Sequence, residues 1–125
     1  MTLRYLTAAD VIDIHEEVIN PHELQGLAKD KSIEAVVARI ENRICYGMVA
    51  DVFELAACYG TYIAVGHVFN DANKRTAFAS MDTCLYLNNI ELTYETIEAG
   101  DMIRRVAQGR LEESALANWL RVIST

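Results

Sequence analysis

The sequence predicts an all-α protein, a compact bundle of about six helices, and three observations carry this prediction. Apolar residues recur at spacings of three and four along most of the chain, and no long alternating strand pattern competes with them. Apolar residues make up 52% of the chain and charged residues 23%, and Pro21 is the only proline, so the composition is that of a core-forming globular protein. A length of 125 residues is typical of one domain, and we assign residues 1–125 to a single domain.

The first helix is expected to begin at Thr7, which can form a capping box with Asp10, and to end near Asn20 and Pro21. Its apolar stripe consists of Val11, Ile14, Val18 and Ile19. Residues 21–30 then combine a proline, a glycine and alternating charges, which is typical of a surface loop. Loops of this length often carry function.

Two further helix starts are marked by capping residues. Ser32, with Glu34 in the first turn, is expected to cap the second helix, and Asp51 with Glu54 the third. The expected buried face of the second helix is Ile33, Val36, Val37, Ile40 and Ile44. The expected apolar face of the third helix is Phe53, Ala56, Gly60 and Ile63, and it ends at His67.

The second half of the chain supplies three more helices. The first of them is expected to open at residues 71–73 and to run to about residues 88–89. Residues 93–108 and 112–123 form the other two, separated by Gly109. The buried stripe of the last helix is Leu116, Trp119, Leu120 and Ile123.

Charge and cysteine content exclude several classes of protein. A net charge of −7 argues against direct nucleic-acid binding and against binding to an anionic membrane surface. No uncharged run is long enough to cross a membrane, and the N-terminus lacks the apolar core of a signal peptide. Cys45, Cys58 and Cys84 form no C-x-x-C pair, and we interpret all three as reduced core thiols of a cytoplasmic protein.

One segment, residues 67–75, differs from ordinary helix material. It reads His67-Val68-Phe69-Asn70-Asp71-Ala72-Asn73-Lys74-Arg75 and spans the end of one predicted helix and the start of the next. The free N–H groups at a helix start attract anions, and two cations in that first turn oppose the helix dipole unless a polyanion binds there. The pattern therefore favours a phosphate site at Lys74 and Arg75.

The same segment offers a metal ligand and a base. Asp71 could hold Mg²⁺ shared with phosphate oxygens, and His67 could exchange a proton near neutral pH. Each residue also has a plain structural interpretation: His67 as a core histidine, Asp71 or Asn73 as a helix cap, the two cations as solvated side chains.

The other two histidines have no such neighbours in the sequence. We interpret His15 and His22 as structural or surface residues.

Residues 67–75 resemble the signature of the Fic/Doc family. The Fic form is His-x-Phe-x-(Asp/Glu)-Gly-Asn-Gly-Arg-x-x-Arg, and the Doc form is His-x-Phe-x-Asp-(Ala/Gly)-Asn-Lys-Arg. The segment matches the Doc form at every defined position, and the resemblance extends over essentially the whole chain, with residues 21–30 least similar. It implies a Fic/Doc-like helical fold.

Two positions depart from the Fic form. Lys74 replaces the glycine before Arg75, and Phe78 replaces the second arginine. In Fic enzymes these positions help to seat ATP for AMP transfer, whereas Doc-type members are understood to bind the nucleotide the other way round and to transfer the γ-phosphate.

The resemblance implies a toxin that acts as a protein kinase on a threonine of elongation factor Tu and halts translation, with ATP as substrate and Mg²⁺ as cofactor. It implies that His67 takes the proton of the target hydroxyl and that Asp71 holds Mg²⁺. Phosphate binding would fall to Asn73, Lys74 and Arg75.

Such a toxin needs an inhibitor, and the sequence contains no (Ser/Thr)-x-x-x-Glu-(Gly/Asn) segment that would inhibit it in cis. The resemblance implies a separate Phd-like antitoxin whose segment folds into a groove of the toxin. The high apolar content also predicts an exposed apolar patch.

Two other functions stay open from the sequence. One is a Fic-type adenylyltransferase that tolerates Lys74, which the Lys74 and Phe78 pair disfavours. The other is a catalytically silent binding module, which the intact His67 disfavours.

Overall fold

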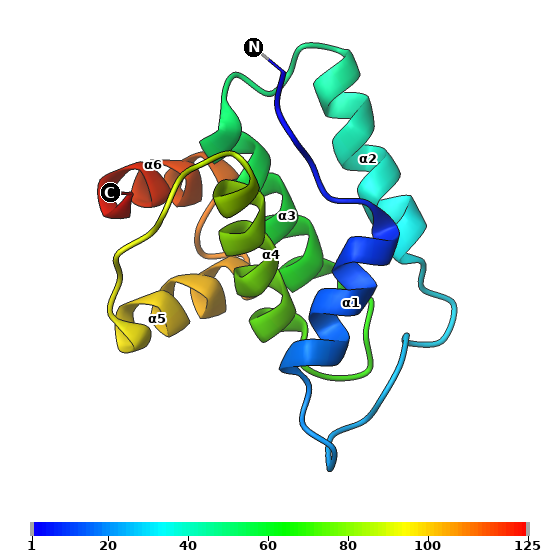
Figure 1. Ribbon diagram of the computed structural model, residues 1–125. Coiled ribbons are helices and arrows are strands. Elements are labelled where there is room, and N and C mark those ends of the chain that lie inside the picture. The colour runs from blue at the N-terminus through cyan, green and yellow to red at the C-terminus, as the bar shows by residue number, and fades with distance from the viewer. Residues whose placement is uncertain (1, 125) are drawn as a thin grey trace.

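The fold was analysed in a computed structural model that describes residues 2–124. Within that range the chain forms six α-helices and no β-strand, as the sequence predicts (Figure 1). The helices are α1 (Ala8–Val18), α2 (Ile33–Cys45), α3 (Val52–Gly66), α4 (Asn73–Leu87), α5 (Thr96–Ala107) and α6 (Glu113–Ile123). The predicted all-α class, with six helices, is therefore confirmed.

Helix α3 lies at the centre of the bundle, where α2, α4, α5 and α6 pack against it, and α1 packs on α2 and α4 (Figure 1). Nine of its residues are buried, among them the unbroken run 55–60, so its burial is not confined to one stripe. Its closest neighbour is α4, and Gly60 permits that approach because a Cβ at this position would collide with Met81 Sδ.

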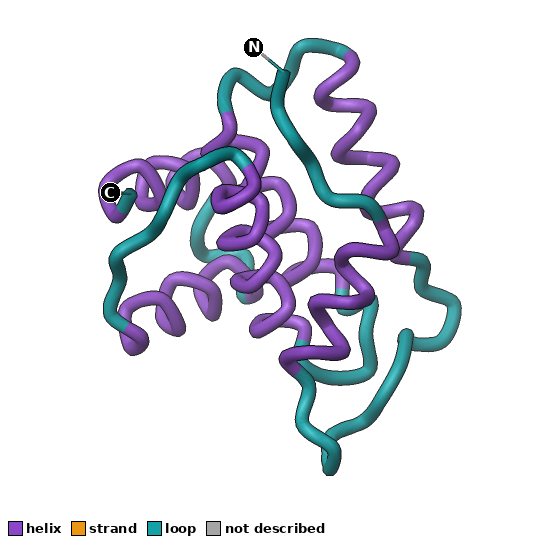
Figure 2. Tube along the Cα trace, viewed as in Figure 1, coloured by secondary structure: helices purple, strands orange, loops and turns teal. Residues whose placement is uncertain are grey.

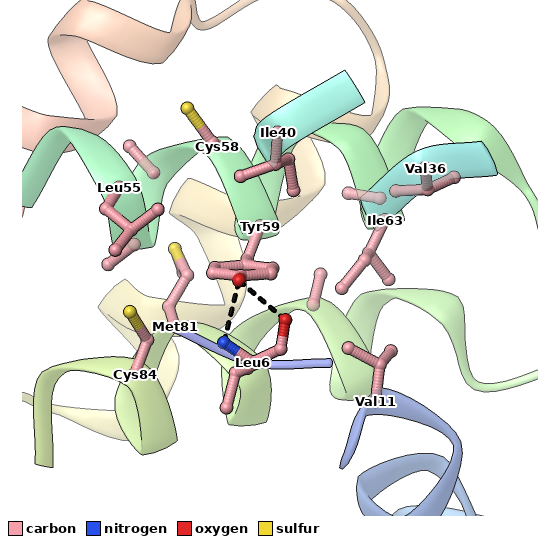
Figure 3. Packing of buried hydrophobic residues seen from close by; sticks show 14 of the residues in the cluster. Leu6, Val11, Val36, Ile40, Leu55, Cys58, Tyr59, Ile63, Met81 and Cys84 are labelled. Atoms are coloured by element: carbon pink, nitrogen blue, oxygen red, sulfur yellow. Dashed lines mark hydrogen bonds between the residues drawn. The ribbon is translucent and has the colours of Figure 1, made fainter. Parts of the chain in front are cut away.

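The N-terminal segment before α1 is pinned to this core by Tyr59 of α3. The Tyr59 hydroxyl accepts a hydrogen bond from the Leu6 N–H at 2.7 Å and donates one to the Leu6 carbonyl at 2.9 Å (Figure 3). Burial raises the pKa of this phenol, which therefore stays protonated and able to donate. The segment that leads into α1 is thus fixed against α3.

The helix starts follow the capping residues read from the sequence. Thr7 forms a capping box with Asp10, Ser32 accepts a hydrogen bond from the Ala35 N–H, and Asp51 accepts one from the Glu54 N–H. Most boundaries fall within two or three residues of the expected ones. Helix α5 begins at Thr96 rather than at residue 93. Leu92 forms an isolated bridge with Ser124, and the Thr93 N–H donates to the Ile123 carbonyl at 2.8 Å, so this segment is held in an extended course beside the end of α6.

One expectation about the cysteines is wrong. Cys58 and Cys84 are buried, and burial raises the pKa of each thiol to about 12, but Cys45 is exposed. Cys45 is the last residue of α2 and lies off the face that carries Ile40. An apolar sequence neighbourhood does not bury a residue that falls off the apolar stripe of its helix.

Two loop connections meet at the end of the bundle that carries residues 67–75. The connection between α1 and α2 and the connection between α3 and α4 lie side by side at one end of the bundle (Figure 2). Helix α1 packs along α4, next to the second of these connections. No helix in residues 2–124 is both long enough and apolar enough to span a membrane.

Candidate active site

His67 follows the last turn of α3 as its C-cap, in the left-handed conformation with φ 49° and ψ 44°. This conformation turns the chain sharply, so His67 leaves the buried face that the α3 pattern predicts for it. Its side chain is exposed and forms no hydrogen bond with any residue from 2 to 124. The core-histidine interpretation is therefore wrong for His67, and its imidazole is accessible to a substrate.

Helix α4 begins without a side-chain cap. Its N-cap is Ala72, also left-handed at φ 63°, and the first backbone N–H of α4 with a helical partner is that of Thr76, which donates to the Ala72 carbonyl. The amides at the start of α4 are therefore not used by a capping side chain. The first turn carries Lys74 and Arg75 and no acidic residue.

Asn73, the first residue of α4, clamps the preceding loop. Its side-chain oxygen accepts from the Phe69 N–H at 3.0 Å, and its Nδ2 donates to the Phe69 carbonyl at 2.9 Å. One Nδ2 proton is left for another acceptor. The side chain that the sequence suggested as a phosphate ligand thus has a structural task of its own.

Asp71 is half-buried in the loop, and its Oδ1 accepts from the Ala72 N–H at 2.8 Å. Oδ2 makes no hydrogen bond within the described residues and is available to a ligand. No group of three or more His, Cys, Asp or Glu side chains that could cage a metal occurs in residues 2–124. A single carboxylate fits Mg²⁺, which is commonly held by one or two carboxylates together with substrate phosphates.

Arg75 is already engaged by the loop between α1 and α2. Its guanidinium forms an ion pair with Glu23 and donates to the Val18 carbonyl at 2.8 Å. The hydrogen bond from Arg75 lowers the pKa of Glu23 to about 2. Lys74, by contrast, is exposed and forms no ion pair with another described residue, so it is the cation most directly free to meet a phosphate.

The same loop is tied to the segment that carries His67 and Asp71. The Asn70 side chain donates to the Gln25 and Leu27 carbonyls at 2.9 and 3.2 Å, and the Ala28 N–H donates to the Val68 carbonyl at 2.7 Å. These bonds account for the side-by-side course of the two connections in Figure 2.

All five residues that the sequence singled out line one cavity of about 610 Å³. They are His67, Asp71, Asn73, Lys74 and Arg75. The structure thus brings an imidazole, a carboxylate and cations to one concave site, a set of groups that group transfer to a hydroxyl can use.

The sequence was also compared with known proteins. The "Fic/DOC family" matches residues 5–85, which is more than half of the chain. The chain is also 32% identical over 120 residues, 95% of its own length and 94% of the other protein, to "Protein kinase doc" of Escherichia phage P1. This chain belongs to the Fic/Doc family, as a Doc-type member. Helices α5 and α6 lie outside the family match but largely inside the alignment with the phage protein.

The cavity of this Fic/Doc protein has an apolar wall that sequence reasoning did not find. Phe78 of α4 and Tyr94 meet edge to face, with ring centroids 4.9 Å apart and planes at 69°. Helix α5 completes the wall opposite α4 with Thr96, Ala99, Gly100, Ile103, Arg104 and Ala107. No pattern in residues 96–107 distinguishes a cavity wall from a core face, so only the packing of α5 against α4 could identify it.

Sequence reasoning also did not connect two polar residues, Glu23 and His15, with the site. Glu23 carried no signal, because an acidic residue in a surface loop is ordinary. His15 did carry one, since it follows Val11 by four residues and therefore continues the buried stripe of α1. The structure buries it, with only 3% of its surface exposed, which confirms the structural interpretation of His15.

Proposed function

We propose that this protein is the toxin of a toxin–antitoxin pair and a protein kinase that transfers the γ-phosphate of ATP to a threonine of elongation factor Tu, which halts translation. The observation that carries the proposal is the shared cavity of His67, Asp71 and Lys74. The name of the phage relative, a protein kinase, supports the reaction class.

The transfer begins at the target hydroxyl. His67 accepts the hydroxyl proton while that oxygen forms a bond to the γ-phosphorus, and the bond from the γ-phosphorus to the bridging oxygen of ADP breaks. His67 suits this task because its imidazole is exposed at the cavity and has no competing hydrogen bond among the described residues. The products are the phosphorylated target and ADP.

Charge neutralisation is divided between the cavity and the nucleotide's cation. Asp71 would hold Mg²⁺ through Oδ2, and the ion would neutralise phosphate charge when bound. Lys74 and the first-turn amides of α4 would bind phosphate oxygens, with Arg75 as a second cation once a phosphate competes with Glu23. Asn73 contributes its remaining Nδ2 proton and keeps the loop in place.

Phe78 supports γ-phosphate transfer over AMP transfer. It stands where the Fic form has its second arginine, and here it lines the cavity wall with an apolar ring packed on Tyr94. The Fic-type alternative would therefore lack one of its phosphate-binding cations.

Intact-mass measurement of purified elongation factor Tu after incubation with this protein, ATP and Mg²⁺ tests the proposal directly. The expected result is the mass of one phosphate. The added mass of AMP would show that the protein is an adenylyltransferase. An unchanged mass would show that elongation factor Tu is not its target.

A double variant tests what sets the direction of the nucleotide. Lys74→Gly together with Phe78→Arg restores the two Fic-form positions, so phosphate transfer should weaken and AMP transfer can emerge. Phosphorylation at the wild-type rate would show that these positions do not control nucleotide orientation.

A Phd-like antitoxin is the proposed inhibitor, acting from a separate chain in the cytoplasm. Large apolar side chains are exposed on several elements, and a partner segment laid over them would bury that apolar surface. The most exposed are Leu24, Tyr46, Tyr86, Ile97 and Val122. Expression with and without the neighbouring small reading frame provides the test, since a chain that is harmless alone at high level is no toxin.

A further inference from the structure

His15 is an unexpected residue to find in the core. It is one of three buried polar residues in the described chain, the others being Thr76 and Ser80. A buried polar group is unfavourable unless it is hydrogen-bonded, and leucine would fill the same space on the α1 stripe more favourably. A histidine there provides what leucine lacks, a hydrogen-bond donor at the edge of a flat ring.

Both contacts of His15 are made with the loop between α3 and α4. Its ring stacks on Phe69, with centroids 3.8 Å apart and planes at 6°, and its Nε2 lies 2.9 Å from the Asp71 carbonyl oxygen. A carbonyl oxygen carries no proton, so Nε2 must be the donor. Helix α1 therefore holds the loop through one stacked ring and one hydrogen bond.

That hydrogen bond acts on the peptide unit next to the Asp71 carboxylate. The Asp71 carbonyl accepts from His15, and the N–H of the same peptide, on Ala72, donates to Asp71 Oδ1. The peptide is thus held at both ends, and its orientation decides where Asp71 Oδ2 points.

The flanking backbone explains why such a restraint is needed. His67 and Ala72 both occupy the left-handed region, which non-glycine residues adopt only when surrounding contacts enforce it. Asn73 fixes the Phe69 end of the loop, and His15 fixes the Asp71 end.

We propose that His15 is a positioning residue of the active site: through Phe69 and the Asp71 carbonyl it sets the orientation of the Asp71 carboxylate and the spacing between Asp71 and His67. This inference rests on the proposed function for its effect on transfer, but its effect on the loop does not depend on that function.

Two substitutions separate the ring from the hydrogen bond. His15→Phe keeps a flat ring against Phe69 but leaves the Asp71 carbonyl without its donor. His15→Gln places an amide donor near the position of Nε2 but removes the ring. His22→Phe is the matched control, because it makes the same change at an exposed histidine.

The first measurement is hydrogen exchange of backbone amides by NMR on the full chain, without substrate. In His15→Phe the Phe69 and Ala72 amides should exchange about tenfold faster or more, because a lost hydrogen bond opens the loop, while the Ile63 amide in α3 stays protected. His15→Gln should restore most of the protection, and His22→Phe should match the wild type.

The second measurement is phosphate transfer to elongation factor Tu. His15→Phe should lower kcat by about tenfold or more with the KM for ATP within about twofold of wild type, because a misplaced carboxylate affects the transition state more than binding. His15→Gln should recover most of the kcat.

Three results would overturn the proposal: wild-type exchange or wild-type kcat in His15→Phe, equal damage in both variants, or loss of cooperative unfolding in both. If wild-type protein transfers nothing, the proposed function fails, and the exchange measurement still decides whether His15 holds the loop.

Discussion

Helices α3 and α4 meet in two regions that are held together by different forces. Along their length, Gly60 lets the helices approach so closely that Met81 fills the space a Cβ would take. In their connection, residues 67–72, two left-handed residues are held by hydrogen bonds, some of which come from outside both helices. The first region is stabilised by apolar burial and the second by a few polar contacts.

This difference separates the region that determines stability, the α3–α4 packing, from the region that carries the candidate site, the connection of residues 67–72. Close packing is tied to the global fold, so changes there alter the free energy of unfolding. The connection is restrained locally, so its geometry can change while the helices remain packed. Each of the following predictions tests one side of that division.

The largest expected effect is on activity alone. His67→Ala should lower phosphate transfer by about 10²–10⁴-fold, because the general base is lost, and should abolish toxicity. The exposed side chain makes no hydrogen bond to a described residue, so the thermal midpoint should stay close to wild type. Transfer kinetics and calorimetry measure the two quantities, with His22→Ala as the control; growth arrest at wild-type expression would contradict the assignment.

At the packed interface between α3 and α4 we expect the opposite, an effect on stability. Gly60→Val should lower the free energy of unfolding by about 1–3 kcal/mol, because its side chain would collide with buried Met81 and with Leu116. Val65→Leu, an enlargement on an exposed face of the same helix, should have little effect. Urea unfolding measures both, and equal midpoints for the two variants would show that the helices can move apart freely.

Asn73→Ala should change the free energy of unfolding by an amount between those expected for His67→Ala and Gly60→Val. It removes two hydrogen bonds to Phe69, so the loop amides should exchange about tenfold faster while unfolding changes by only about 1 kcal/mol. Asn73→Asp keeps the acceptor for the Phe69 N–H and should protect that amide better than alanine does. If exchange is unaffected in both variants, the clamp does not hold the loop.

The smallest effect concerns the ion pair between Glu23 and Arg75. The pKa of Glu23 is lowered from 4.5 to about 2 in the folded protein, so the pair is fully formed above pH 4.5 and is lost as the pH falls toward 2. NMR titration of the Glu23 carboxyl should follow this shift, and Glu23→Gln should remove the pH dependence from the Arg75 side-chain signals. A Glu23 carboxyl that titrates near 4.5 would mean that the loop is not held by Arg75.

Capping was the most dependable guide to the helices. Thr7, Ser32 and Asp51 all start helices where the sequence places them, because a cap is an interaction between residues only three positions apart. The buried face of α2 was also anticipated, with Ile33, Val36, Val37 and Ile40 all buried. The exposure of Cys45 was not anticipated, although its position off that face follows from the helical spacing.

The sequence by itself determined the six helices and the gathering of His67, Asp71 and Lys74, because periodicity, caps and a nine-residue motif act over short stretches of chain. Only the tertiary structure decided what surrounds them. His15 reaches Asp71 across 56 positions and Glu23 reaches Arg75 across 52, and α5 forms the far wall of the cavity. These contacts follow from how α1 and α5 pack on α4 and how the loops meet beside it, and no local pattern encodes that packing.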